Sequence, residues 1–133
     1  MSIAVVDASI ITAFYASDDP RRDLVAARLT TGDALFAPAH LDAEVVSALR
    51  GMSRSHPALR AVVPAALHHL AGFPIRRMAL APLMQRMWEL RDNVTPYDAA
   101  YVALAERLDA CLVTSDSKLA AATGPRCDVE LIA

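Results

Sequence analysis

Residues 3–7, Ile3-Ala4-Val5-Val6-Asp7, form a short apolar run that ends on a carboxylate. A second apolar run, Cys111-Leu112-Val113, leads through Thr114 and Ser115 to Asp116. Short apolar runs bounded by polar residues are typical of strands that are buried inside a sheet. Bringing a carboxylate into apolar surroundings is costly unless something compensates its charge. Each run therefore predicts a buried strand with an acidic residue just beyond its end.

The rest of the chain alternates between helical and strand-like segments. Strands are expected at residues 3–6, 34–37, 75–79, 111–114 and 128–132. Helices are expected at residues 9–16, 20–31, 40–54, 57–72, 81–91, 97–108 and 116–122. Because the strands are short, apolar and separated by helices, this pattern predicts a mostly parallel central sheet covered on both faces. We expect one domain, residues 1–133, with a three-layer α/β/α fold.

Composition narrows the class of protein. Hydrophobic residues make up 55% of the 133 residues and charged residues 21%, which is typical of a globular domain and not of a disordered chain. No apolar stretch is long enough to span a membrane, and no leader precedes the first strand, so we expect a cytoplasmic protein with no membrane partner. Two cysteines and four histidines without metal-ligand spacing argue against a zinc site.

Asp98 and Glu44 are two further acidic residues at notable places in expected helices. Thr95 is expected to cap the helix that contains Asp98, yet Asp98 falls on the same side of that helix as apolar Val102. Glu44 lies at the margin of an apolar stripe, and we expect no helix end close enough for it to act as a cap. The neighbouring Asp42 is predicted to face solvent.

Local explanations exist for each acidic residue taken singly. Asp7 and Asp116 each precede an expected helix, where a carboxylate accepts hydrogen bonds from free backbone N–H groups. Asp98 is explained in the same way as part of a capped first turn. Glu44 is explained as an exposed glutamate paired with Arg50 or another base. These structural interpretations stay open at the level of the sequence.

The four together favour a metal site. In parallel sheets ligands bind beyond the carboxyl ends of the strands, where Asp7 and Asp116 are expected. Clustered carboxylates suit Mg²⁺ or Mn²⁺, and these ions activate water for attack on a phosphodiester. The hydroxyls of Ser9 and Thr114 are expected to support such a site, although helix capping or a strand end explains them equally well.

Four segments also resemble a known family. They are Val5-Val6-Asp7-Ala8-Ser9, PAHLDAEVVSALR from Pro38 to Arg50, NVTPYDAAYVALAERL from Asn93 to Leu108, and LVTSDSKLA from Leu112 to Ala120. In this order they resemble the PIN domain and, more closely, the toxin ribonucleases of the VapBC toxin–antitoxin family. The resemblance covers nearly the whole chain, while residues 55–92 contribute little to it.

The resemblance implies a Mg²⁺- or Mn²⁺-dependent endoribonuclease with Asp7, Glu44, Asp98 and Asp116 as its acidic quartet. Asp7 and Asp98 would be the most direct metal ligands, with Asp116 completing the site and Glu44 helping to position the attacking water. Two positions depart from the pattern. Ser47 stands where many relatives carry asparagine, and Ser117 stands where some carry an extra acid, so a fifth acidic ligand is not expected.

The resemblance further implies a homodimer and a cognate VapB-like antitoxin that obstructs the acidic site. The net charge of −2 by itself predicts no nucleic-acid partner, but an RNA path needs basic residues around the acids. The candidates are Arg21, Arg22, Arg50, Arg54 and Lys118.

Three other functions compete with this one. A haloacid-dehalogenase-like phosphatase is disfavoured because Asp7 is followed by Ala8-Ser9 and not by a second aspartate. A phosphoreceiver module is disfavoured because paired early acids are missing. A catalytically silent PIN-like module that binds RNA or protein stays open as the alternative.

Overall fold

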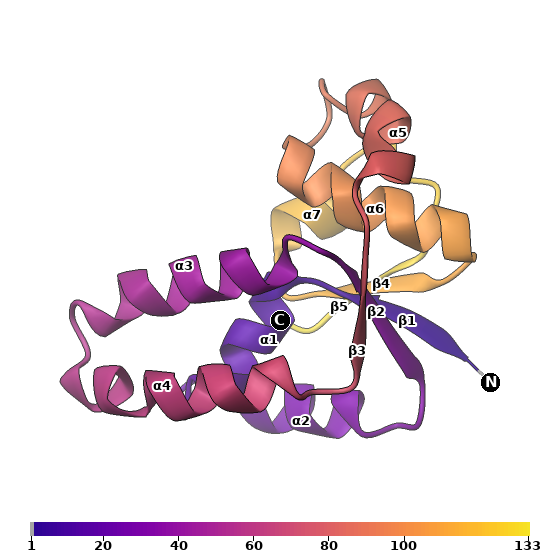
Figure 1. The fold of residues 1–133 in the computed structure, drawn as a ribbon. Coiled ribbons are helices and arrows are strands. Elements are labelled where there is room, and N and C mark those ends of the chain that lie inside the picture. The colour runs from indigo at the N-terminus through magenta and orange to yellow at the C-terminus, as the bar shows by residue number, and fades with distance from the viewer. Residues whose placement is uncertain (1) are drawn as a thin grey trace.

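The computed structural model describes residues 2–133; Met1, the first residue of the expected domain, lies outside them. Within this range five strands form one sheet in the order β3-β2-β1-β4-β5, and all four pairs are parallel (Figure 1). The strands are β1 Ile3–Val6, β2 Ala34–Pro38, β3 Ile75–Met78, β4 Cys111–Thr114 and β5 Val129–Leu131. Each lies within one or two residues of its predicted bounds.

The strand order sets where a ligand would bind. Chain order runs outward from β1 in one direction through β2 and β3, then resumes on the other side with β4 and β5. The order therefore reverses between β1 and β4, and such switch points are where open parallel sheets bind ligands. Asp7 directly follows β1, and Asp116 follows β4 by two residues.

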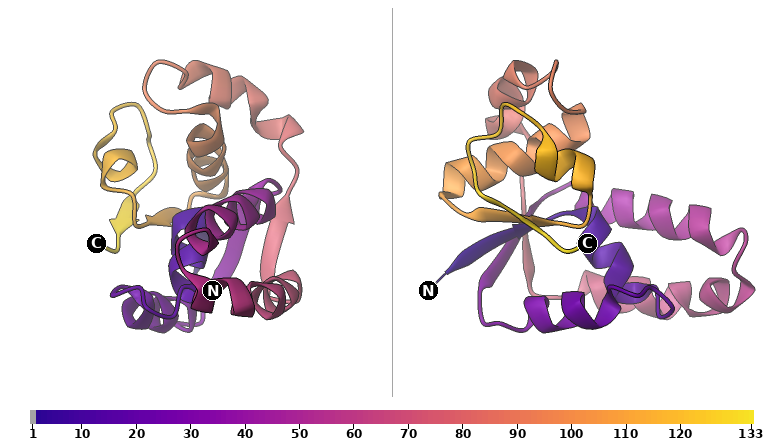
Figure 2. Two further views of the ribbon diagram at one scale, coloured as in Figure 1. Left: turned by 90° about the vertical axis from the view of Figure 1, so that its left-hand side faces the viewer. Right: turned by 180° about the vertical axis from the view of Figure 1, so that it is seen from behind.

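Helices cover both faces of the sheet. They are α1 Ala8–Tyr15, α2 Arg22–Leu29, α3 Leu41–Ser53, α4 Pro57–Ala71, α5 Met84–Glu89, α6 Pro96–Leu108 and α7 Ser117–Ala121, with the 3₁₀ turn η1 Ala81–Leu83 before α5. Figures 1 and 2 show α5, α6 and α7 on one side and α1 and α2 on the other. The hairpin of α3 and α4 extends away from the sheet on the side where β1 ends (Figure 1). The predicted three-layer α/β/α fold is confirmed.

Helix α6 is the centre of the core. Residues 99–105 are all buried, including four alanines, so the helix is covered around its whole circumference. It contacts β1, β2 and β4 on one side and α5 on the other. The alanines allow close approach of the backbones at these contacts, because their side chains take up little space. The packing therefore fixes the first turn of α6, which carries Asp98, against the edge where β1 and β4 end.

Two predicted helices differ from the structure. The segment 81–91 is not one helix: it divides into η1 and α5, and α5 ends at Glu89, after which turns follow. The segment 20–31 is helical only over α2, because the Asp19 carboxylate accepts from the Arg21 backbone N–H and holds a turn before it. At the other end the Thr30 hydroxyl bonds back to the Ala26 carbonyl. In the described part of the chain no helix is long and apolar enough to cross a membrane.

Candidate active site

Asp7 is a buried carboxylate held at the junction of β1 and α1. It caps α1 by accepting a hydrogen bond of 3.2 Å from the Ile10 backbone N–H. The Ser9 hydroxyl donates to its Oδ1 at 2.5 Å, and the Thr114 hydroxyl donates to its Oδ2 at 2.5 Å. Asp7 is only 4% exposed. The capping interpretation is thus correct for Asp7, but capping alone does not require a carboxylate to be this deeply buried.

Burial dominates the electrostatics of Asp7. Removal from water raises its pKa from 3.8 to about 6, although the bonds from Ser9, Thr114 and Ile10 act in the opposite direction. The charge of Asp98 raises the pKa further. Hydrogen bonds from neutral donors have therefore not compensated the negative charge. A cation at this place would do so.

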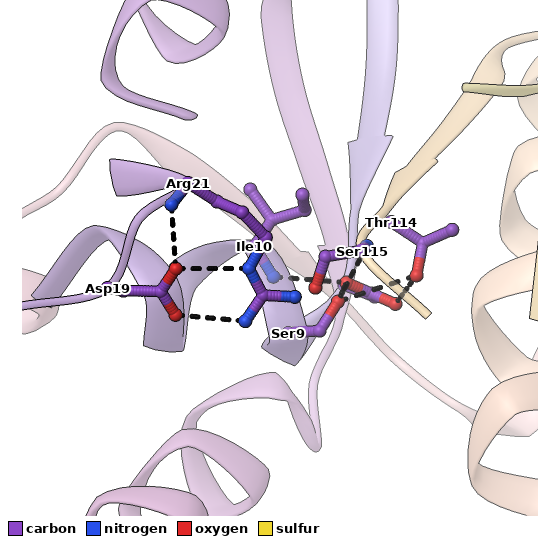
Figure 3. A network of polar contacts seen from close by, with 7 residues as sticks. Ser9, Ile10, Asp19, Arg21, Thr114 and Ser115 are labelled. Carbon is purple, nitrogen blue, oxygen red and sulfur yellow. Dashed lines mark hydrogen bonds and ion pairs between the residues drawn. The ribbon is translucent and has the colours of Figure 1, made fainter. Parts of the chain in front are cut away.

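The residues at the end of β4 join Asp7 to Asp116. The Ser9 hydroxyl accepts from the Ser115 backbone N–H at 3.0 Å, and the Thr114 hydroxyl accepts from the Asp116 backbone N–H at 3.0 Å. Figure 3 shows Ser9, Thr114 and Ser115 meeting in this network, with the Asp19–Arg21 pair to one side. Both predicted supporting hydroxyls thus contact Asp7. Their role in catalysis stays a prediction.

Asp116 and Asp98 lie at the N-terminal ends of two helices. Asp116 caps α7 by accepting from the Lys118 and Leu119 backbone N–H groups at 2.9 and 3.4 Å. Asp98 lies in the first turn of α6, where the Thr95 hydroxyl accepts from its backbone N–H at 3.2 Å. Burial raises the pKa of Asp98, and the negative charges of Asp116 and Glu44 raise it further. Asp116 and Glu44 therefore lie close enough to Asp98 to destabilise its ionised form.

Glu44 is held by two side chains. The Tyr101 hydroxyl donates to Glu44 Oε1 at 2.6 Å, and His40 Nε2 lies 3.3 Å from the same oxygen. Burial raises the pKa of Glu44, but the bonds from His40 and Tyr101 outweigh it and the pKa falls below its usual value. Glu44 lies in the first turn of α3 but caps no helix. The interpretation of Glu44 as an exposed glutamate paired with Arg50 or another base is correct only in part, because the side chain is half-buried and its base is His40.

His40 and Tyr101 were not predicted as part of the site. Tyr101 is 1% exposed, and burial followed by its bond to Glu44 raises its pKa, so it stays a hydrogen-bond donor. Two spacings could have indicated these residues. Tyr101 follows Asp98 by three positions, and His40 precedes Glu44 by four, so each pair shares a helix face.

Two open cavities adjoin the carboxylates. One, of about 550 Å³, is lined by Asp98 and Asp116 together with Arg91 and Lys118. The other, of about 460 Å³, is lined on one side by Glu44 and Asp116. Because Asp116 lines both, the two cavities meet at this side chain. Asp7 lines neither, but Ser9, which donates to it, lines the second.

The basic candidates are dispersed. Arg21 is tied to Asp19 by two hydrogen bonds, and Arg22 donates to the Phe14 carbonyl. Arg50 and Arg54 lie at the far end of α3 from Glu44. Of the five predicted basic residues, only Lys118 lines the cavity that contains Asp98. Arg91, which also lines it, was not predicted.

The carboxylates of Asp7, Asp98 and Asp116 have the chemistry that suits a divalent metal, but they do not lie in ligand geometry. Across residues 2–133 no three His, Cys, Asp or Glu side chains are arranged to hold a metal ion. The chemistry nevertheless fits, because hard cations prefer carboxylate oxygens and the raised pKa values of Asp7 and Asp98 report uncompensated negative charge. In the described residues no lysine or arginine forms an ion pair with Asp7, Asp98 or Asp116. Ligation would require these side chains to turn toward one another.

Comparison with known proteins identifies relatives in sequence and in fold. VapC3, a ribonuclease of Mycobacterium tuberculosis, is 43% identical over 118 residues, which cover 89% of this chain and 85% of VapC3. The crystal structure of VapC20 from the same species, described as a Sarcin-Ricin loop cleaving toxin, has a TM-score of 0.67 at 18% identity and covers 89% of this chain and 93% of its own. VapBC2 of Rickettsia felis, solved bound to a promoter DNA fragment, has a TM-score of 0.66 at 14% identity, covering 97% of this chain and 98% of its own.

These two structures share the fold with this chain, whereas VapC3 is similar in sequence. The family model for the PIN domain matches residues 4–125, which include all four carboxylates. The chain therefore belongs to the PIN-domain family, among its VapC-like toxins.

Proposed function

We propose that this protein is a metal-dependent endoribonuclease and the toxin of a type II toxin–antitoxin pair. Its sequence relatives are named as VapC ribonucleases. The observation that carries the proposal is the convergence of Asp7, Glu44, Asp98 and Asp116, from four separate segments, on the switch point of a parallel sheet. A capping role needs no such convergence, because each cap acts at its own helix.

Asp7, Asp98 and Asp116 would hold the cation, which is Mg²⁺ or Mn²⁺ because the donors are all carboxylate oxygens. Such an ion, when bound, supplies charge stabilisation at the phosphate and makes a water more acidic. Glu44 has a lowered pKa and is therefore ionised at neutral pH, so it can accept the proton of the attacking water. The bonds from Tyr101 and His40 fix its orientation.

The reaction is hydrolysis. A bond forms between the water oxygen and phosphorus, and the bond from phosphorus to one ribose oxygen breaks. Glu44 takes one proton of the water, and the departing ribose oxygen takes up a proton from solvent. The burial of Asp7 keeps its carboxylate away from bulk water, which strengthens the electrostatic interactions there.

The proposal includes two partners. A cognate VapB-like antitoxin would bind this chain and obstruct the acidic site, as expected for a member of a VapBC pair. The Rickettsia felis protein is named VapBC2, a name that joins a VapB to a VapC. That pairing supports an antitoxin for the Rickettsia protein and, by relationship, for this chain. A second copy of the chain would form a homodimer.

A catalytically silent RNA- or protein-binding module is the alternative. It is favoured by one observation: the carboxylates of the described residues do not lie in ligand geometry. The raised pKa values of Asp7 and Asp98 argue against it, because a binding module gains nothing from buried uncompensated charge.

Cleavage of end-labelled cellular RNA separates the two functions. We expect the wild-type protein to cut RNA in Mg²⁺ or Mn²⁺ and to stop in excess chelator. Asp7→Asn and Asp98→Asn should abolish cleavage with the fold intact by circular dichroism. Asp23→Asn, an exposed carboxylate in the first turn of α2, is the matched control and should cut normally. Full activity of both site variants, or cleavage that survives the chelator, would contradict the proposal.

A further inference from the structure

Trp88 is an exposed aromatic side chain with an arginine stacked on it. It lies in α5 and is 64% exposed. The Arg91 guanidinium is 4.4 Å from the centre of its ring, and Arg91 Nη1 donates to the Trp88 carbonyl at 3.0 Å. An exposed tryptophan gives up most of the free energy that its burial would provide. Aromatic rings and guanidinium planes of this kind are surfaces on which unpaired bases stack.

The stacked pair adjoins the proposed catalytic carboxylates. Arg91 lines the cavity of about 550 Å³ that also contains Asp98 and Asp116. Lys118, in the first turn of α7, lines the same cavity. Trp88 does not line the cavity itself but contacts Arg91, which does. A nucleotide next to the cut bond therefore meets Arg91 and Lys118 first, with the Trp88 ring beyond Arg91.

The two cations of this cavity are available for an anion. Within residues 2–133, four of the twelve arginines are held in ion pairs with carboxylates, and Arg21, which lines the other cavity, is one of them. In the part of the chain that the structure describes, neither Arg91 nor Lys118 forms an ion pair. Phosphates approaching Asp98 and Asp116 would be repelled unless positive charge lay beside them. Arg91 and Lys118 supply that charge.

We propose that Trp88, Arg91 and Lys118 form a nucleotide subsite for single-stranded RNA beside the cleaved bond. One unpaired base stacks on the Trp88–Arg91 pair, and Arg91 and Lys118 contact the flanking phosphates. This inference rests on the proposed ribonuclease function and assigns part of its substrate path. Stacking accepts any base, so the subsite contributes affinity and requires an unpaired strand, with little preference for sequence.

Binding of a short, unstructured, fluorescein-labelled RNA tests the subsite. Fluorescence anisotropy in Mg²⁺ is measured on an Asp98→Asn background, which does not consume the RNA. Trp88→Ala should weaken binding about 10-fold, whereas Trp88→Phe keeps a stacking surface and most of the affinity. Arg91→Ala and Lys118→Ala should each lower the dependence of log affinity on log salt by about one.

Two control variants match these changes elsewhere. Arg107→Ala removes an arginine from the last turn of α6, at the opposite end from Asp98. Leu24→Ala removes a 62% exposed apolar side chain on α2. Both should bind the RNA as the parent does. Thermal denaturation should give equal melting temperatures for Trp88→Ala and its parent, because the side chain is exposed.

The kinetics of RNA cleavage, measured on variants that keep all four carboxylates, separate the possible outcomes. Trp88→Ala should raise KM about 10-fold and leave kcat nearly unchanged, because the ring does not touch the reacting phosphate. If Trp88→Ala and Arg91→Ala bind and cleave RNA like the wild type, the subsite is wrong while the ribonuclease function stands. If they weaken only the complex with a co-expressed antitoxin, the surface docks a protein and the subsite is also wrong. Absence of cleavage by the wild type would instead overturn the proposed function.

Discussion

The Thr114 hydroxyl donates to Asp7 Oδ2 at 2.5 Å, across 107 positions of the sequence. Thr114 is the last residue of β4, and Asp7 directly follows β1. The bond therefore joins the two strands between which the strand order reverses. Thr114 also accepts from the Asp116 backbone N–H. One fully buried hydroxyl therefore sets the position of two proposed metal ligands at once.

Thr114→Val tests this relationship. It keeps the shape of the side chain but removes a donor to Asp7 and an acceptor for Asp116 N–H. Because Asp7 Oδ2 and the half-buried Asp116 N–H each lose this bond, while Asp7 Oδ1 keeps those from Ser9 and Ile10, we expect a loss of about 1–3 kcal/mol in the free energy of unfolding. RNA cleavage should fall by at least about 10-fold, because a ligand that loses its orienting hydrogen bond binds metal less well.

Thr114→Ser is the matched variant for that experiment. It keeps the hydroxyl and loses a methyl group, so it should retain cleavage close to that of the wild type with a loss of only about 1 kcal/mol in stability. Urea denaturation and the RNA cleavage rate check both variants. Equal cleavage by Thr114→Val and Thr114→Ser would show that the hydroxyl does not position the ligands.

Tyr101→Phe tests the orientation of Glu44. The change removes the hydroxyl that donates to Glu44 Oε1 and leaves the buried ring in place. Because that bond lowers the pKa of Glu44, its loss raises the pKa, so the ionised base appears at higher pH. We expect kcat to fall about 10-fold and the acidic limb of the pH–rate profile to move upward.

Tyr15→Phe removes a hydroxyl that contacts His69 away from the site, and it serves as the control for Tyr101→Phe. Its pH–rate profile should coincide with that of the wild type. A Tyr101→Phe profile that is lower but unshifted would assign Tyr101 a packing role only.

Much of the architecture follows from local sequence. The apolar runs that become β1 and β4 are bounded by polar residues, and Thr95-Pro96 starts α6 as predicted, so these elements lie close to their expected bounds. Segment 81–91 was predicted less well. Its apolar residues fit a helix, but burial of Leu83 and Leu90 against the core and the turns after Glu89 decide its shape, and these are tertiary effects.

The candidate site was predictable only in part, for a similar reason. Asp7 and Asp116 are marked by their place after apolar strands, which the sequence reports directly. Glu44 and Tyr101 are 57 positions apart, and nothing local indicates that they touch. Such a contact depends on how α3 and α6 are placed against the sheet, which periodicity does not specify.

The buried charge of Asp7 predicts an unusual pH dependence of stability without metal. Its pKa in the folded protein is about 6, above the usual value of 3.8, so the folded state holds the proton more tightly than the unfolded chain. Folding is therefore most favoured when Asp7 is protonated. The contribution of Asp7 to the free energy of unfolding is fully present below pH 3.8 and is lost as the pH rises to about 6. The difference corresponds to about 3 kcal/mol.

Urea denaturation in chelator at a series of pH values measures this effect. We expect Asp7→Asn to lack this decline and to be more stable than the wild type at neutral pH, because it buries no charge. Parallel stability curves for the two proteins would show that Asp7 is not buried in ionised form.

A bound divalent cation should offset the loss of stability that ionisation of Asp7 causes. A cation bound to the ionised form of Asp7 and Asp98 competes with protons, whose affinity for both carboxylates is raised by burial. Added Mn²⁺ should therefore raise the melting temperature of the wild type more above about pH 6 than below it. At a metal concentration about 100 times the Kd, the stabilisation would be about 2.7 kcal/mol. Asp7→Asn and Asp98→Asn should lose most of this increase, and Asp23→Asn should keep it. An increase that is independent of pH, or equal in Asp7→Asn, would place the bound metal elsewhere on the protein.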